Sequence, residues 1–145
     1  MIAVDTNLLV YAHREDSEFH RPALEALLSL ARRPEPWGLP WPCVHEFVAI
    51  VTHPRIYDPP SPLPVALEAI AVWLDAPGCR PLAEGSGYFG RLRSLALGGR
   101  VHGPAIHDAR VAALCLHHGV NELWTADRDF GRFPGLKTRN PLVGT

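Results

Sequence analysis

Hydrophobic residues in this chain fall into short continuous runs and into longer stretches with helical spacing. Ile2–Val4 is an apolar run that ends at Asp5, which predicts a buried strand with a carboxylate at its carboxyl end. Asn121–Thr125 has the same character, and Asp127 lies just past its end. Cys79–Leu82 is a further short strand, which its proline favours at a sheet edge.

Five stretches repeat apolar residues at the spacing of one helix face. The first runs from near Pro22 to before Pro34, the second from near Pro42 to before Pro54, and the third from Leu67 to near Pro77. The fourth runs from Tyr88 to Gly98, and the fifth from near Pro104 to His118. Pro34–Gly38 is interpreted only as a break after the first helix. The proline-rich stretch His53–Pro64 predicts a loop inserted within one domain.

Strands that alternate with helices predict an α/β fold, here a three-layer α/β/α sandwich around a mostly parallel sheet. A chain of 145 residues with 47% hydrophobic residues fits a single domain spanning 1–145. Ligands of such sheets bind beyond the carboxyl ends of the strands. Asp5 and Asp127 both fall at that edge, which is the first indication of a functional site.

Charge and cysteine content narrow the class of protein. The net charge is −1, which argues against a protein that coats nucleic acid by charge alone. Residues 1–76 carry −5 and residues 77–145 carry +4, so a site formed by both halves could combine acidic ligands with a positive rim. Three scattered cysteines, no apolar run long enough for a bilayer and no signal-like N-terminus predict a reduced, cytoplasmic protein without a membrane segment.

Three acidic residues lie where simple solvation is a poor explanation, although each has a structural alternative. Asp5 is flanked by apolar residues, but it could be a helix N-cap. Glu46 has apolar neighbours on a helix expected to be covered on two sides, but it could extend to solvent or pair with an arginine. Asp108 opens a helix that is apolar nearly all round, where an acid also suits the helix dipole.

Asp127 and Asp129 add two carboxylates directly after a predicted strand, and turn or capping chemistry explains only one of them. If several of these acids converge, each pair about 5 Å apart repels by about 3 kcal/mol at an effective dielectric constant near 20. Either some of these acids are protonated or a divalent cation neutralises them, and all-oxygen ligation favours Mg²⁺ or Mn²⁺. An open site of this kind is suited to phosphodiester hydrolysis.

Four segments together resemble the acidic motifs of PIN-domain ribonucleases, and the small chain looks most like the VapC-type toxins of toxin–antitoxin pairs. The segments are Val4–Tyr11, His45–Phe47, His107–Ala113 and Thr125–Phe130. The resemblance implies a Mg²⁺- or Mn²⁺-dependent endoribonuclease, a homodimer that is inhibited by a VapB-type antitoxin. It also implies a catalytic quartet with supporting residues around it. The quartet is Asp5, Glu46, Asp108 and Asp127, with Asp5 and Asp108 as principal metal ligands, Asp129 as a weaker candidate, and Thr6, Asn7 and Thr125 in support.

Two other functions compete with this hypothesis. A phosphatase with an aspartate nucleophile usually needs a second aspartate two residues after the first, where this chain has Asn7. It also needs a lysine that binds the phosphate, and the only lysine of this chain is Lys137. A catalytically weak PIN-fold module that binds protein or RNA partners would be expected to lack acids at the motif positions, and all four retain theirs. No histidine pair has the spacing of a helical zinc site, so zinc is not expected. His45 and His107 each precede a candidate ligand by one residue, so on a helix they are expected to point about 100° away from it.

Overall fold

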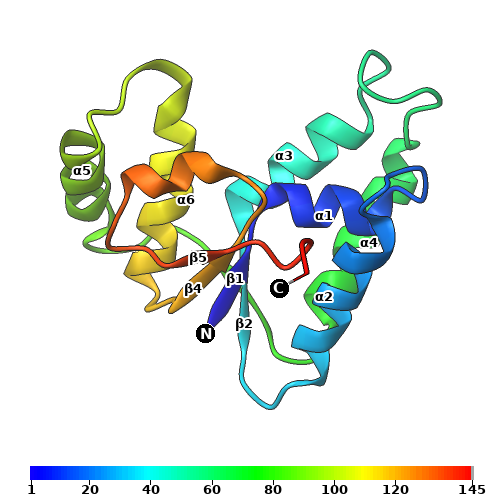
Figure 1. Ribbon diagram of the computed structural model, residues 1–145, viewed down its shortest axis with the longest axis horizontal. Coiled ribbons are helices and arrows are strands. Elements are labelled where there is room, and N and C mark those ends of the chain that lie inside the picture. The colour runs from blue at the N-terminus through cyan, green and yellow to red at the C-terminus, as the bar shows by residue number, and fades with distance from the viewer. Residues whose placement is uncertain (145) are drawn as a thin grey trace.

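The computed structural model describes residues 1–144 and contains a five-stranded parallel sheet with helices on both faces (Figure 1). The strands are β1 (Ile2–Val4), β2 (Trp37–Pro40), β3 (Cys79–Leu82), β4 (Glu122–Trp124) and β5 (Thr138–Arg139). The helices are α1 (Thr6–His13), α2 (His20–Arg32), α3 (Trp41–Val51), α4 (Leu63–Asp75), α5 (Tyr88–Gly98) and α6 (Ile106–His117), with 3₁₀ turns η1 (Gly103–Ala105) and η2 (Arg128–Arg132).

The sheet order is β3-β2-β1-β4-β5, and every neighbouring pair is parallel. Figure 1 shows α5 and α6 on one side of the strands and α1, α2 and α4 on the other. The predicted three-layer α/β/α class with a parallel sheet is therefore confirmed. Cys79–Leu82 forms the outermost strand beside β2, as its proline indicated.

The interpretation of Pro34–Gly38 as only a helix break was wrong, because Trp37–Pro40 forms the strand β2. The prolines and glycine of this segment hide its strand character in the sequence. Both large side chains of β2, Trp37 and Leu39, are nevertheless buried. Gly38 is required here because a Cβ atom at this position would lie 2.8 Å from Cδ1 of Leu82 and 3.3 Å from Cβ of Ala3.

Two further elements were not predicted, for opposite reasons. Helix α1 is mostly buried, so it lacks the polar face that makes a helix visible in a sequence. Strand β5 has two exposed residues and carries no hydrophobic signal. The other helices match the predicted stretches closely, except that Pro64 lies in the first turn of α4 and not in the loop before it, because proline is tolerated there.

The proline-rich loop before α4 is fixed against the end of α1 by Arg14. Its guanidinium donates to the carbonyl of Pro59 at 3.0 Å and to Oγ of Ser61 at 3.2 Å, and it lies over the ring of Tyr57 at 4.3 Å. Asp16 accepts two hydrogen bonds from the same group. Within residues 1–144, no helix has both the length and the apolar character that crossing a membrane requires.

Candidate active site

The carboxyl ends of β1 and β4 bring the first and last acidic motifs together. The two strands pair in register, with Val4 opposite Trp124, and the amide of Asp5 donates to the carbonyl of Trp124 at 3.0 Å. Next to this edge lies a cavity of about 110 Å³. Its lining residues are Asp5, Thr6, Asn7, Glu46, Ile50, His107, Asp108, Val111 and Asp127.

Asp5 is the buried anchor of the site, with 7% of its surface exposed. Its carboxylate accepts hydrogen bonds from the amide of Thr6 at 2.8 Å and from the hydroxyl of Thr125 at 2.7 Å. Burial raises the pKa of Asp5, and the charge of Asp127 adds to the rise, while these hydrogen bonds oppose it. Asp5 therefore both caps α1, the alternative considered from the sequence, and lines the cavity.

Asn7 and Thr125 join the start of α1 to the segment that follows β4. The amide nitrogen of the Asn7 side chain donates to Oγ1 of Thr125 at 3.3 Å, and Oδ1 of Asn7 accepts from the amide of Ala126 at 3.2 Å. Oγ1 of Thr125 also accepts from the amide of Asp127 at 2.9 Å. The backbone that carries Asp127 is thereby held beside Asp5.

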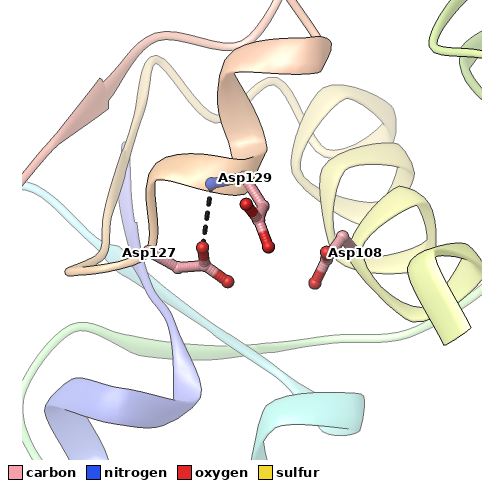
Figure 2. A group of neighbouring side chains, drawn as sticks. All are labelled: Asp108, Asp127 and Asp129. Carbon is pink, nitrogen blue, oxygen red and sulfur yellow. Dashed lines mark hydrogen bonds between the residues drawn. The ribbon is translucent and has the colours of Figure 1, made fainter.

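Three carboxylates form the tightest acidic cluster. Asp108 lies at the start of α6, and Asp127 and Asp129 lie around the start of η2. Each of the three places a carboxylate oxygen within 4.8 Å of the others (Figure 2). Oδ1 of Asp127 accepts from the amide of Asp129 at 2.8 Å. The pKa of Asp108 is raised by burial and by the charges of Asp127, Asp5 and Asp129, and the charge of Arg132 opposes this. Within residues 1–144 this is the one cluster of three or more candidate metal ligands.

Asp5 and Glu46 lie outside this cluster of three but line the same cavity as Asp108 and Asp127. Glu46 on α3 is more accessible than predicted, because one side of α3 is open at this edge of the sheet. Its pKa is raised by partial burial, by the charge of Asp5 and by that of Asp108. The predicted residues thus meet in one region, with Asp129 in the cluster but not on the cavity wall.

The hydroxyl of Thr6 lies in this region without a hydrogen-bond partner, although only 4% of the residue is exposed. Thr6 and Glu46 line the same cavity, and the Thr6 side chain lowers the pKa of Glu46. A buried polar atom left unpaired is costly, which favours a ligand or water in the cavity beside it. Clustered carboxylates and an unpaired hydroxyl form an all-oxygen donor set, which fits a hard divalent cation.

One residue was misjudged from the sequence. His107 was expected to point away from the acids because it precedes Asp108 by one residue, but it lines the same cavity. The cavity extends around the first turn of α6, so neighbouring positions on that helix both reach it. The signal that could have identified His107 is its position in the first turn of α6, because the start of this helix lies at the site.

Comparisons with known proteins point to one family. A family model described as the PIN domain matches residues 2–136. Ribonuclease VapC43 of Mycobacterium tuberculosis is 38% identical over 144 residues, covering 99% of this chain and 97% of the relative. Ribonuclease VapC48 of the same species is 32% identical over 140 residues, with 97% of each chain covered.

Solved structures show the same fold. VapBC2 from Rickettsia felis, crystallised with a DNA fragment from its promoter, matches with a TM-score of 0.66 and 20% identity over 97% of this chain and 98% of that one. VapC20 of Mycobacterium tuberculosis, described as a toxin that cleaves the sarcin–ricin loop, matches with a TM-score of 0.65 and 14% identity over 90% and 93% of the two chains. From its sequence and its architecture together, the chain belongs to the PIN domain family and, within it, to the VapC ribonucleases.

Proposed function

We propose that this protein is a metal-dependent endoribonuclease toxin that hydrolyses RNA phosphodiester bonds. The observation that carries the proposal is the meeting of Asp108 and Asp127 in one cavity with Asp5 and Glu46. Close carboxylates repel one another, and either protonation or a bound cation relieves this repulsion. The ribonuclease names of its near full-length relatives support the same activity.

Each acid has a distinct proposed role. Asp5 and Asp108 would be the principal ligands of Mg²⁺ or Mn²⁺, and Glu46 and Asp127 would complete the site, directly or through water. Asp129, which belongs to the cluster of three but is exposed, is the weaker candidate. A bound divalent cation supplies positive charge for the reacting phosphate and lowers the pKa of a coordinated water.

The remaining residues of the site orient the acids. Thr125 contacts the Asp5 carboxylate and the amide of Asp127 through one hydroxyl, so the backbone of Asp127 is held beside the Asp5 carboxylate. Asn7 supports the same segment through its side-chain amide. Thr6 offers its unpaired hydroxyl beside Glu46. These residues would thereby preorganise the oxygen ligands before a cation binds.

The proposal extends to partners and location. We propose that the single domain 1–145 forms a homodimer, is inhibited by a VapB-type antitoxin and acts on RNA in the cytoplasm. Membership of the VapC ribonucleases supports the antitoxin and the RNA substrate.

The test is cleavage of structured RNAs by purified protein in Mg²⁺ or Mn²⁺, followed by addition of EDTA. We expect EDTA to abolish cleavage, and we expect Asp5→Asn and Asp108→Asn to abolish it without unfolding the protein. Asp75→Asn, which removes an exposed acid at the end of α4, is the matched control and retains activity. Equal cleavage by the Asp5 and Asp108 variants would show that a contaminant is responsible and would contradict the proposal.

A further inference from the structure

A second, larger cavity opens beside the candidate active site. It has a volume of about 410 Å³ and is lined by Pro42, Glu46, Pro104, His107, Asp108, Arg110 and Val111. Glu46, His107, Asp108 and Val111 also line the smaller cavity that contains Asp5 and Asp127. The two cavities therefore share a wall, and a group bound in the larger one lies directly beside the acidic site.

The walls of the larger cavity combine apolar surfaces with one aromatic ring and one cation, besides the carboxylates of Glu46 and Asp108 on the shared wall. Pro42 at the start of α3, Pro104 in η1 and Val111 supply the apolar surfaces. His107 and Arg110 are three residues apart on α6, so their side chains lie on the same side of that helix. Such a lining suits a flat, partly apolar group that carries hydrogen-bond acceptors at its edge.

Arg110 is held in place by Glu84, which does not line the cavity. Its Nε lies 3.1 Å and its Nη2 lies 3.0 Å from Oε1 of Glu84, in the segment between β3 and α5. A guanidinium carries five N–H donors, and these contacts use only part of them. The others remain for a ligand, and the contact to Glu84 restricts the directions in which they point.

We propose that this cavity binds the base of a nucleotide next to the scissile phosphodiester, with Arg110 donating to the acceptor edge of a guanine. The inference rests on the ribonuclease function proposed above. Guanine presents two adjacent acceptors, O6 and N7, that match a guanidinium, whereas adenine places an amino donor at the same edge. A flat base also fits between proline and histidine side chains, because its faces are apolar enough to contact them.

The first experiment measures cleavage preference. A short RNA randomised around the cut site is digested in Mg²⁺ by the wild type, by Arg110→Gln and by Arg91→Gln, and the new ends are sequenced. Arg91→Gln is the matched control, because Arg91 is exposed on α5 and lines neither cavity. We expect the wild type and the control to prefer guanine at one position beside the cut by about tenfold or more. Arg110→Gln should still cut, with that preference lost and with KM raised more than kcat is lowered.

The second experiment separates this inference from the proposed function, because it needs no catalysis. Guanosine is titrated into the wild type and each variant while the imidazole proton signals of His107 are followed by NMR. We expect guanosine to shift these signals in the wild type and in Arg91→Gln, adenosine to shift them less, and Arg110→Gln to show no shift. Arg110→Lys, which keeps the charge but not the fork of donors, should bind guanosine without discriminating it from adenosine.

The outcomes are distinct. RNA cleavage without a guanine preference, or an unchanged preference in Arg110→Gln, overturns the base-binding inference and leaves the ribonuclease intact. If no form of the protein cleaves RNA, the proposed function fails, and guanosine binding alone then decides the role of the cavity. Equal thermal midpoints of the variants and the wild type would show that a lost preference does not come from unfolding.

Discussion

The hydroxyl of Thr125 donates a 2.7 Å hydrogen bond to Oδ2 of Asp5, and this contact joins residues 120 positions apart. The same oxygen accepts from the amide of Asp127 and from the side chain of Asn7. One buried hydroxyl therefore fixes the ends of β1 and β4 at the point where the acids meet. Its removal leaves a buried carboxylate without one of its donors.

We expect Thr125→Val to lower the free energy of unfolding by about 1–3 kcal/mol, because valine keeps the shape but leaves Oδ2 of Asp5 unpaired. Thr125→Ser keeps the hydroxyl and should cost less. Thr138→Val makes the same substitution at an exposed strand position and should stay within about 0.5 kcal/mol of the wild type. Urea unfolding in EDTA measures all three, and an unchanged midpoint for Thr125→Val would contradict this account.

Asp108→Asn should preserve or raise the thermal midpoint of the metal-free protein, because it removes repulsion from Asp127, Asp5 and Asp129. The rise in thermal midpoint on addition of Mg²⁺ or Mn²⁺, expected for the wild type, should disappear in the variant, since a ligand is lost. Differential scanning calorimetry with and without EDTA measures both effects, with Asp75→Asn as the control. A fall of several degrees without metal would mean that Asp108 has a structural role instead.

His13 gives the fold a dependence on pH away from the acidic site. Its Nε2 lies 2.9 Å from Oγ of Ser61, and its ring packs edge-on against Phe47. Burial lowers the pKa of His13 below the ordinary value of 6.5, and the charges of Arg14 and His20 lower it further. The folded state thus favours the neutral ring, so stability from this group is complete above about pH 6.5 and is lost as the pH falls towards the lowered pKa.

We therefore expect the difference in unfolding free energy between wild type and His13→Gln to shrink between about pH 7.5 and pH 5. Glutamine cannot gain a proton, so the variant lacks this contribution to the pH dependence. His102→Gln replaces an exposed histidine and should follow the wild type. Parallel pH profiles for wild type and His13→Gln would refute the assignment.

Gly38 and Gly90 should respond in opposite directions to alanine. At Gly38 the new Cβ would lie 2.8 Å from the Leu82 side chain, so Gly38→Ala should destabilise the protein by about 1–3 kcal/mol. At Gly90, within α5, no atom beyond the adjoining residues and the backbone of the helix itself lies within 4 Å of the new Cβ, and Gly90→Ala should stabilise the helix by up to about 1 kcal/mol. Denaturant midpoints of the two variants test this, and a loss at Gly90 as large as at Gly38 would disprove the packing argument.

The sequence predicted the strand ends at Asp5 and Asp127 because short apolar runs that end in acids are visible without tertiary information. It could not predict β2, whose prolines and glycine look like a turn and whose strand character comes from pairing with β1 and β3. The hydrogen bond between Thr125 and Asp5 and the contact between Arg110 and Glu84 depend on how distant segments pack. Neither contact produces a periodic pattern in the sequence, so neither could be predicted from it.

The segment Pro34–Gly38 also shows what local sequence signals cannot predict. Local signals there describe the backbone correctly as non-helical, but only the neighbouring strands decide that Trp37 and Leu39 enter the sheet. Glu46 was placed in the right region for partly the wrong reason, since its helix is less covered than its apolar neighbours indicated. Motif order was more informative here than burial inferred from single residues.

The position of β1 between β2 and β4 has a consequence for synthesis. The second neighbour of β1, Glu122–Trp124, is made only after both β2 and β3. A nascent polypeptide therefore carries Asp5 on a half-paired strand, without Asp127 or Asp129, until β4 and the segment after it have emerged. Products of interrupted translation that stop before this strand lack the acidic cluster, so incomplete chains would not carry the proposed activity.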